Sequence, residues 1–288
     1  MHEYRFLRFP GGKPKAVTFS YDDGPKFDLR LAEIFDRYGM KATFNLAAVA
    51  LDAERSDWHM TAKEVQEHIL AKGHEIAVHG EHHLAPGKLR PVDGIREFLN
   101  CRIRLEQTFG RIIRGAAYPN SGIRQMDTGN SYEKVRSYLA DLDFAYARTL
   151  AGDNDAFRLP EDFLAWMPSA HHDNPAVFSY IEKFKNAGYG PDVYGDSRYP
   201  RLLYIWGHSF EFENNGNWDR IEKICQALAG MEDTYYATNI EICDYITAQR
   251  ALILSQDQKT IFNPSAISVW ISSDGSAIEI KSGESVRL

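Results

Sequence analysis

The sequence predicts an α/β fold, a distorted (β/α) barrel of about seven parallel strands with a small C-terminal β-appendage. Short apolar runs alternate with longer amphipathic ones through most of the 288 residues, the order that builds a parallel sheet. Near the C-terminus the pattern changes to a strict alternation of apolar and polar residues. A doubly wound open sheet is the alternative, but no glycine-rich nucleotide-binding turn follows a predicted strand.

The expected strands are short apolar runs that are rich in β-branched and aromatic residues. A parallel strand is buried on both faces, so it shows a continuous apolar run. We expect strands at Ala16–Tyr21, Ala42–Leu46, Glu75–His79, Ile112–Tyr118, Phe144–Thr149 and Leu202–Gly207, with a less regular one near Phe163–Pro168.

Between these strands apolar residues recur every three or four positions, the spacing of an amphipathic helix. Thr61 is expected to cap one helix, which should end at Gly73. Asn217 and Asn239 are expected to begin two later helices. Other helices are predicted from about Leu29 to Gly39, Ile95 to Leu105 and Val177 to Gly188.

The appendage is predicted from apolar residues that alternate with polar ones on both sides of a turn. Asp274-Gly275 is typical of a hairpin turn. We therefore expect a barrel over residues 1–255 and a β-hairpin extension over 256–288. The extension could cover a barrel edge or serve in self-association. The alternating residues are Ile267, Val269, Ile271, Ile278 and Ile280.

Composition excludes several classes of partner. A formal net charge of −7 argues against nucleic acid and against an anionic membrane surface. No apolar run approaches the length of a membrane-spanning helix. Three cysteines, odd in number and far apart, argue against a disulfide framework or a thiolate zinc site. They are Cys101, Cys225 and Cys243.

Two adjacent carboxylates end the first predicted strand. Asp22 and Asp23 are followed by Gly24-Pro25, a pair that stops the strand. Adjacent strand residues point to opposite faces unless the backbone bends, so the two carboxylates could do different work. One could bind a metal while the other handles protons. An ordinary solvated turn is the competing interpretation.

A histidine pair ends the third predicted strand. His79 and His83 are four residues apart, a spacing that can bring two imidazoles to one metal. With one carboxylate they would leave an open position for water, as catalytic zinc sites do. His82 could replace His83, and His74 is expected to be structural. A polar loop is the competing interpretation.

Two further strand ends could complete the site. His208 follows the strand Leu202–Gly207 and could act as a general acid or base, because a histidine changes charge near neutrality. After Ile112–Tyr118 the chain turns sharply, where backbone N–H groups could face an oxyanion. All these clusters are expected at one face of the barrel.

Taken together and in this order, the clusters resemble the polysaccharide deacetylases of carbohydrate esterase family four, over roughly residues 14 to 250. The family's T-F-D-D-G-P motif resembles residues 18–25, with Ser20 and Tyr21 as extra residues. The resemblance implies that Asp22 is the catalytic base and Asp23 a metal ligand. The family's H-S/T-x-x-H motif resembles residues 79–83, with Gly80 in place of the hydroxyl residue. The resemblance further implies that His79 and His83 complete the metal triad and that His208 is the catalytic acid.

Two departures from the family pattern are visible. The R-x-P motif reads Ala117-Tyr118-Pro119-Asn120, so the arginine that steadies the catalytic aspartate is missing, and Arg148 is the candidate replacement. The D-x-x-D-W motif has no clean match. Trp166 could form the wall for the acetyl methyl group, with ordinary core packing equally open. His171 and His172 are unexplained. The expected substrate-binding residues are Tyr118, which could pack against a sugar, Pro119, Asn120, Arg148 and Trp166.

The implied function is hydrolysis of N- or O-linked acetyl groups on a carbohydrate, with release of acetate. One divalent ion is expected, zinc first, with cobalt, manganese or nickel as alternatives. The partner is then an acetylated glycan, and the oligomeric state is open. A small-molecule (cyclic) amidohydrolase and a carbohydrate-binding protein that has lost activity are the alternatives. No signal peptide is seen, so a cytoplasmic location is expected, although export stays open because many glycan deacetylases act outside the cell.

Overall fold

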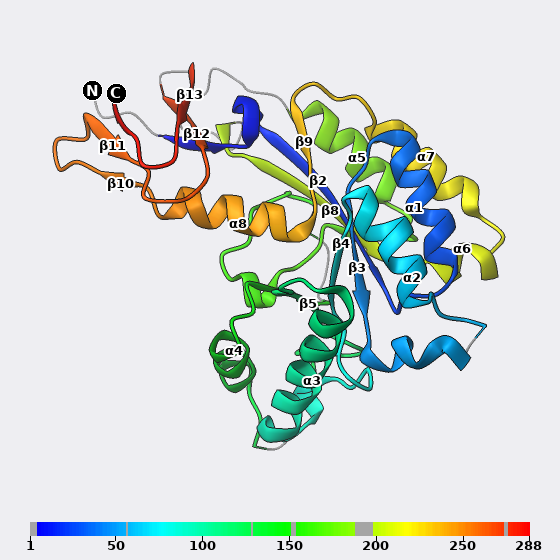
Figure 1. Ribbon diagram of the computed structural model, residues 1–288. Coiled ribbons are helices and arrows are strands. Elements are labelled where there is room, and N and C mark those ends of the chain that lie inside the picture. Colours follow the sequence, from blue (N-terminus) through cyan, green and yellow to red (C-terminus); the bar gives the residue numbers. More distant parts are fainter. Residues whose placement is uncertain (1–4, 56, 128, 151–153, 188–197, 274–275) are drawn as a thin grey trace.

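The structure is a computed structural model that describes residues 5–55, 57–127, 129–150, 154–187, 198–273 and 276–288. Its main body is one parallel sheet in the order β6-β5-β4-β3-β2-β8-β7, and β9 pairs with the first part of β2 (Figure 1). Every strand pair in this sheet is parallel. The strands are β2 (Lys15–Asp22), β3 (Ala42–Leu46), β4 (Glu75–Val78), β5 (Gly115–Ala117), β6 (Tyr146–Arg148), β7 (Ala170–His171), β8 (Arg201–Gly207) and β9 (Thr234–Tyr236).

The sheet curls into a distorted barrel, as predicted. One irregular segment contacts both of its edges. Trp166 forms a parallel bridge to Arg148 of β6, and its N–H donates to Ala147 O at 3.0 Å. Four residues later the same segment pairs with β8 as β7. The segment from Trp166 to His171 therefore connects the two edge strands of the curled sheet.

The prediction of a strand near Phe163–Pro168 is wrong. Phe163–Ala165 is a 3₁₀ turn, and the regular strand comes later, at Ala170–His171. The side chain of Asp162 accepts the N–H of Leu164 at 2.9 Å, which favours the turn. Pro168 has no N–H to donate to a ladder. The apolar pattern is the same for a buried turn and a buried strand.

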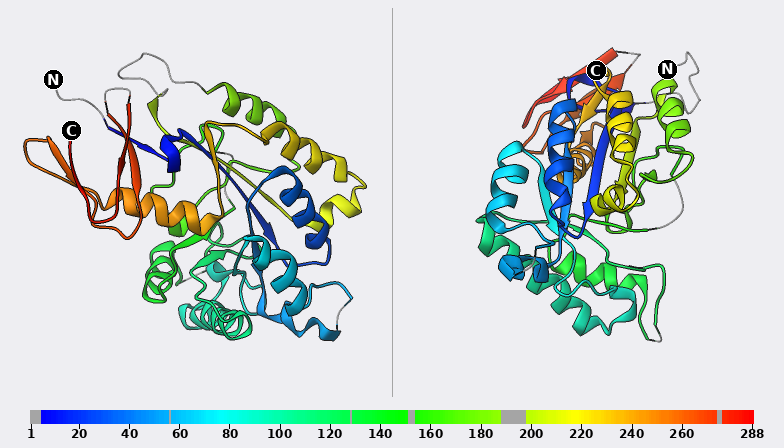
Figure 2. Two further views of the ribbon diagram at one scale, coloured as in Figure 1. Left: turned by 45° about the horizontal axis from the view of Figure 1, so that its top comes forward. Right: turned by 90° about the vertical axis from the view of Figure 1, so that its right-hand side faces the viewer.

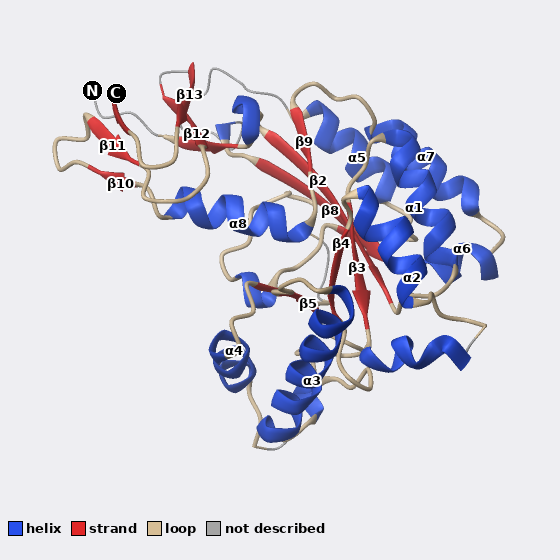
Figure 3. Ribbon diagram, viewed as in Figure 1, coloured by secondary structure: helices blue, strands red, loops and turns tan. Residues whose placement is uncertain are grey.

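Helices pack against the strands and share their apolar core (Figures 2 and 3). Thr61 and Glu64 form a capping box, and Gly73 ends the segment in a left-handed conformation, as predicted. Between them the helix is not a regular α-helix: it has a π turn at Val65–Ile69 and then a 3₁₀ turn at Leu70–Lys72. The helices are α1 (Phe27–Tyr38), α2 (Ala62–Glu64), α3 (Pro91–Phe109), α4 (Tyr132–Asp141), α5 (Val177–Asn186), α6 (Ser209–Asn214), α7 (Trp218–Leu228) and α8 (Asn239–Arg250).

The first turn of α8 is bonded to the amino ends of the central strands. Thr238 caps α8, one residue before the expected Asn239. The N–H of Asn239 donates to Thr43 Oγ1 at 3.0 Å, and the N–H of Ile240 donates to Glu75 Oε2 at 2.9 Å. This end of the barrel is therefore filled by a helix, and the carboxyl ends of the strands are left for the site.

The appendage consists of two three-stranded antiparallel sheets. One joins β1 (Phe6–Arg8), β12 (Val269–Ser273) and β13 (Ser276–Ile280), and the other joins β10 (Ile253–Leu254), β11 (Thr260–Phe262) and β14 (Ser285–Arg287). The expected turn at Asp274-Gly275 lies outside the described residues, although Ser273 and Ser276 beside it are paired. Both sheets lie at the amino ends of the barrel strands (Figure 1). The predicted boundary at 255/256 would fall between β10 and its partner β11 and stays a prediction.

The three cysteines are free and buried, on α3, α7 and α8. Among the described residues, no helix has the length and apolar character needed to cross a bilayer.

Candidate active site

A backbone bend at the end of β2 turns two adjacent carboxylates to one side. Asp23 has φ 75° and Gly24 has φ 65°, so the backbone leaves the extended conformation directly after Asp22. Asp22 Oδ2 then lies 3.9 Å, and Asp23 Oδ1 3.5 Å, from Nε2 of the same imidazole, that of His79. A side chain at Gly24 would place its Cβ 2.6 Å from Leu46 Cδ2. Another residue at this position would be strained by the positive φ and would have to displace the Leu46 side chain.

Asp23, His79 and His83 form a group whose ligand atoms all lie within 4.8 Å of one another. Asp23 Oδ1 is 3.2 Å from His83 Nε2 and 3.5 Å from His79 Nε2. Donors around a tetrahedral zinc ion, each about 2.0 to 2.1 Å from it, are about 3.3 Å apart. The pKa of Asp23 falls to about 2, because hydrogen bonding to His83 and the charge of His79 outweigh burial. The donor set therefore suits a divalent ion in both spacing and charge.

Hydrogen bonds outside the triad orient its imidazoles. His79 is 1% exposed, and its Nδ1 lies 2.9 Å from Ala117 O. A proton on Nδ1 leaves Nε2 as the ligand atom, the usual arrangement of a metal-binding histidine. Asn120 Nδ2 donates to His83 O at 2.7 Å. Asn120, expected to contact substrate, therefore supports the loop of His83, and Pro119 is buried beside Gly80.

A buried carboxylate on α3 holds the loop that carries His83. Glu97 is 3% exposed, and its Oε1 accepts the N–H of His82 at 2.7 Å and of Leu84 at 3.0 Å. A Cβ at Gly80 would lie 2.8 Å from the same oxygen. The side chain of His82 is 59% exposed and contacts Glu97 Oε2 at 3.3 Å, so it does not replace His83 in the triad. Glu97 was not predicted as a site residue; its one signal in the sequence is an acidic residue on the apolar face of α3.

Asp22 is buried between an arginine and an amide. Arg148, which is fully buried, donates to Asp22 Oδ2 and stacks 4.5 Å from the ring centre of Trp206. Asn45 Nδ2 donates to Asp22 Oδ1 at 2.8 Å. Burial by itself would raise the pKa of Asp22, but Arg148, followed by His79 and His208, brings it below its ordinary value. This carboxylate is therefore ionised, and Asn45 is a contact that the sequence analysis missed.

His208 faces the carboxylates with one ring nitrogen and Glu211 with the other. Its Nε2 is 3.9 Å from Asp22 Oδ2 and 4.0 Å from Asp23 Oδ2. Its Nδ1 is 3.3 Å from Glu211 Oε2, which also accepts the N–H of His208 at 3.0 Å. Burial opposes the charged imidazole, but Glu211 and the two aspartates raise the pKa of His208 above its ordinary value. The capping-box spacing of His208 and Glu211 is a sequence signal that could have identified this pair.

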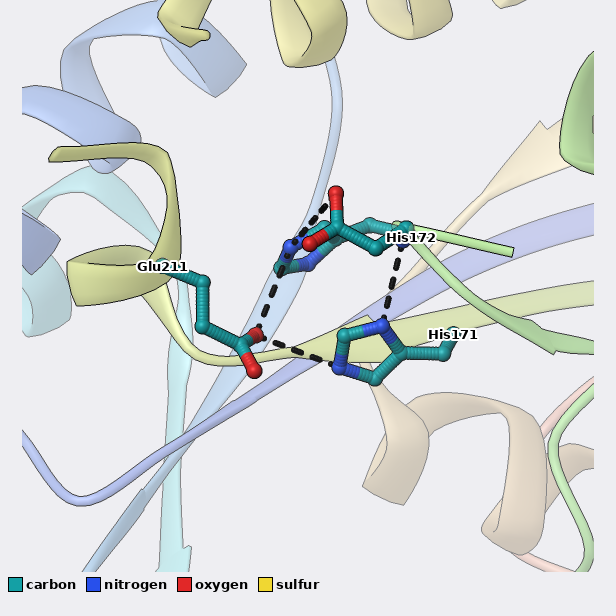
Figure 4. A group of neighbouring side chains, drawn as sticks. His171, His172 and Glu211 are labelled. Atoms are coloured by element: carbon teal, nitrogen blue, oxygen red, sulfur yellow. Dashed lines mark hydrogen bonds and ion pairs between the residues drawn. The ribbon is translucent and has the colours of Figure 1, made fainter. Parts of the chain in front are cut away.

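His171 and His172 gather at Glu211, beside the site (Figure 4). Glu211 Oε2 lies 3.2 Å from His171 Nε2 and 3.4 Å from His172 Nε2. The N–H of Asp173 donates to His171 Nδ1 at 3.1 Å, so the proton of a neutral His171 is on Nε2 and points at Glu211. His172 is buried against Phe212, and neither ring nitrogen has a hydrogen-bond partner among the described residues. Because a metal-binding histidine donates its second nitrogen, this group is better explained as a hydrogen-bonded carboxylate than as a second metal site.

Tyr118 and Trp166, which were expected to contact the substrate, are both buried in the core. Tyr118 is 1% exposed and its hydroxyl donates to Leu164 O at 2.7 Å, so its ring cannot pack against a sugar. Trp166 is also 1% exposed, with edge contacts to Tyr146, Phe163 and Tyr204. It is a core residue and not the wall of an acetyl site.

Known proteins resemble this chain in part of its sequence and in its fold. The model of the polysaccharide deacetylase family matches residues 10–146. No curated protein matches the chain by sequence. At the identities of the solved structures below, the likeness shows the fold alone.

Three solved structures illustrate that likeness. A Mycobacterium smegmatis protein described as a polysaccharide deacetylase is 17% identical, with a TM-score of 0.58 over 86% of this chain and 96% of its own. The allantoinase Puue is 12% identical, with a TM-score of 0.56 over 82% and 91%. A mutant of the peptidoglycan deacetylase PdaC from Bacillus subtilis is 14% identical, with a TM-score of 0.50 over 82% and 93%.

Proposed function

We propose that this chain, which belongs to the polysaccharide deacetylase family through residues 10–146, removes acetyl groups from a carbohydrate with the help of one divalent ion. The family makes it a hydrolase of amide or ester bonds. The observation that carries the finer proposal is the meeting of Asp22, Asp23, His79, His83 and His208 at one end of the barrel. These side chains come from three strand ends that are distant in the sequence.

Asp23, His79 and His83 would hold the ion. The spacing of their ligand atoms suits a tetrahedral site, and the contact of His79 Nδ1 with Ala117 O leaves its Nε2 for coordination. When bound, a divalent ion supplies Lewis acidity towards the acetyl carbonyl and makes nearby water more acidic. Zinc suits this donor set, as do cobalt, manganese and nickel.

Asp22 would act as the general base. It removes a proton from the water whose oxygen forms the new bond to the acetyl carbon. Arg148 and Asn45 fix the orientation of this carboxylate, and Arg148 favours its ionised form. Arg148 thereby takes the role of the arginine that is missing from the family's third motif. The backbone N–H of Asn120 is our candidate donor to the oxyanion.

His208 would act as the general acid. Its Nε2 donates a proton to the amine or hydroxyl that leaves as the C–N or C–O bond breaks. Glu211 Oε2 lies 3.3 Å from Nδ1, and its negative charge would keep the charged ring turned towards the site. One proton goes from water to Asp22 and one from His208 to the sugar, and the products are acetate and a deacetylated carbohydrate.

Acetate release from acetylated substrates tests this proposal. Metal-loaded protein is incubated with acetylated chitooligosaccharides, peptidoglycan fragments and acetylated xylan. Asp22→Asn, with its metal content measured alongside, serves as the control. We expect release from one class, lost in the variant while metal content stays near that of the native protein. A fully active Asp22→Asn would make the base assignment wrong, and release from no class would contradict a deacetylase.

A further inference from the structure

Glu211 brings three histidine side chains to one carboxylate oxygen. Its Oε2 lies 3.2 Å from Nε2 of His171 and 3.4 Å from Nε2 of His172 (Figure 4). The same oxygen lies 3.3 Å from Nδ1 of His208 and accepts the backbone N–H of that residue at 3.0 Å. The carboxylate that faces the proposed general acid is therefore shared with two other imidazoles.

Strand pairing places His171 beside His208. Strand β7 pairs with β8 in parallel, with His171 opposite Trp206, and His208 follows two residues later. The ring centres of His171 and His208 are 6.3 Å apart, and the ring of His171 meets that of Trp206 edge-on at 4.6 Å. Glu211, in the first turn of α6, contacts both imidazoles. Two strands and a helix therefore fix this arrangement.

A backbone hydrogen bond fixes the direction of the His171 ring. The N–H of Asp173 donates to His171 Nδ1 at 3.1 Å. Because this nitrogen accepts, the ring carries its proton on Nε2, which can only donate. The carboxylate that faces Nε2 is that of Glu211. His171 is therefore oriented as a donor to Glu211.

His172 contributes shape and not charge. A Cβ at Gly207 would lie 1.9 Å from His172 Nδ1, so this ring packs directly against the backbone of β8. Burial lowers the pKa of His172 to about 2, which leaves the imidazole neutral. Burial alone would raise the pKa of Glu211, but the contact with His171, followed by that with His208, brings it well below its ordinary value. Of the two additional imidazoles, His171 is thus the one that stabilises the charge of Glu211.

We propose that His171 is a positioning residue for the proposed general acid. It donates from Nε2 to Glu211 and so holds the carboxylate in the place from which it orients His208. This inference rests on the proposed function, in which His208 protonates the sugar amine or hydroxyl that leaves. It follows that loss of His171 should slow a reaction that needs this proton and spare one that does not.

Substrates with different leaving groups separate this role from a general loss of structure. A sugar amine or hydroxyl needs a proton in order to leave, whereas 4-nitrophenolate leaves as an anion. On the acetylated carbohydrate that the native protein cleaves, His171→Ala should lower kcat by about tenfold or more, a fraction of what a general acid contributes, with KM near its native value. The rate on 4-nitrophenyl acetate should stay native. Metal content and melting temperature are measured for each variant.

Two conservative variants test the position of the donor. The amide nitrogen of a glutamine can take the place of Nε2, whereas that of an asparagine takes the place of Nδ1, away from Glu211. His171→Gln should therefore restore much of the native kcat, and His171→Asn should not. His68 provides the matched control, since it is a half-buried histidine in the segment Val65–Ile69, before β4. His68→Ala should behave as the native protein does.

The outcomes separate this proposal from the proposed function. If the native protein releases acetate from a carbohydrate and His171→Ala does so with the same kcat, the positioning role is wrong while the deacetylase proposal stands. A raised KM with unchanged kcat would make His171 a substrate contact, and equal losses on both substrates would make its role merely structural; either result contradicts the proposal. If the native protein releases acetate from no carbohydrate, the deacetylase proposal fails, and the role of His171 fails with it.

Discussion

Three residues of the candidate site adopt left-handed backbone conformations although none is glycine. They are Asp23 with φ 75°, His83 with φ 61° and Asn120 with φ 52°. Such conformations are uncommon outside glycine and cluster at functional sites, where surrounding contacts hold them. Here those contacts are specific hydrogen bonds, among them the one from Asn120 to the carbonyl of His83. Removing such a contact should affect the metal triad before it affects the fold.

Glu97 offers a direct test of this view. Glu97→Ala leaves the N–H groups of His82 and Leu84 without their acceptor, so His83 should lose its orientation. We expect metal affinity to fall by about tenfold or more, since the supporting contacts of metal ligands usually contribute about that much. Competition with a chelator measures the affinity, and the visible absorption spectrum of the cobalt-loaded protein reports the ligand geometry.

Glu81 provides the matched control in the same loop. Its carboxylate accepts from Asn100 Nδ2 at 2.8 Å instead of from the backbone beside His83. Glu81→Ala should leave the affinity and the cobalt spectrum unchanged. A folded Glu97→Ala protein with a native spectrum and affinity would show that the carboxylate has no positioning role.

Arg148→Met tests the replacement of the family's arginine. Without the guanidinium, the pKa of Asp22 should rise and its carboxylate should turn, so we expect kcat to fall by about a hundredfold or more. Affinity of the acetylated substrate should change much less. Loss of a buried charge partner also destabilises the fold, so substrate binding and melting temperature are measured together.

The control for Arg148 is an exposed arginine. Arg114 pairs with Asp244 at a partly exposed position near the amino ends of the strands. Arg114→Met should retain native turnover. If Arg148→Met turned over substrate as fast as Arg114→Met, Asp22 would not depend on this arginine.

At the scale of elements, the strands were predictable because each is a buried apolar run between helix-like segments. The regular parts of β5 and β6 are shorter than the predicted Ile112–Tyr118 and Phe144–Thr149. Apolar burial continues past the last ladder hydrogen bond, so hydropathy overestimates the length of a short strand. Asp22, His79 and His208 lie at the carboxyl ends of three parallel strands. Their proximity was predictable, because the carboxyl ends of parallel strands lie at the same end of a barrel.

Long-range packing limited what could be predicted of the site. Asp23, His79 and His83 lie in two short segments whose spacing suggests chemistry. Glu97 and Asn45 act through contacts between elements, for which no local pattern exists. The same limit explains the errors at Tyr118 and Trp166, because a polar or aromatic residue at a strand end can face a site or the core. The sequence does not say which.

Glu75 connects β4 to the first turn of α8 and should make stability depend on pH. It accepts hydrogen bonds from Tyr146, Thr43 and the N–H of Ile240, and burial raises its pKa from 4.5 to about 7. The folded protein therefore holds this proton more tightly than the unfolded chain. Stability from Glu75 is present below pH 4.5 and is lost as the pH rises through about 7.

Glu75→Gln removes this titration and should change the pH dependence in a defined direction. The melting temperature of the variant minus that of the native protein should rise between pH 5 and pH 8. Burial lowers the pKa of His74 to about 4, but His74 is present in both proteins and largely cancels in the difference. Calorimetric scans across this range measure it. A difference that stays constant or falls would contradict a raised pKa for Glu75.

At the scale of the whole molecule, the two ends of the chain meet away from the site. Strand β1 pairs with β12, so the segment before the barrel and the segment after it share one sheet. This sheet lies at the amino ends of the barrel strands (Figures 1 and 2), whereas Asp23, His79 and His83 follow the carboxyl ends of β2 and β4. We therefore expect the appendage to contribute to stability and not to turnover.

Tyr245 joins the barrel to this sheet and allows that expectation to be tested. Its hydroxyl donates to Arg8 O at 2.7 Å and accepts the N–H of Trp270 at 2.8 Å, and the side chain is 3% exposed. Tyr245→Phe leaves both backbone groups unpaired, at a cost of about 1–3 kcal/mol. For a chain of this size each kcal/mol lowers the melting temperature by about 2–4 °C.

Tyr235→Phe is the matched control for Tyr245→Phe. Both rings stack on Phe9, with centres 6.2 and 6.1 Å away, but the hydroxyl of Tyr235 makes no hydrogen bond to a described residue. We expect only Tyr245→Phe to melt earlier in calorimetric scans, and both variants to release acetate at the native rate. Slower acetate release by Tyr245→Phe at temperatures where it is fully folded would mean that the appendage reaches the site through the barrel. An unchanged melting temperature would mean that the two backbone groups find other partners.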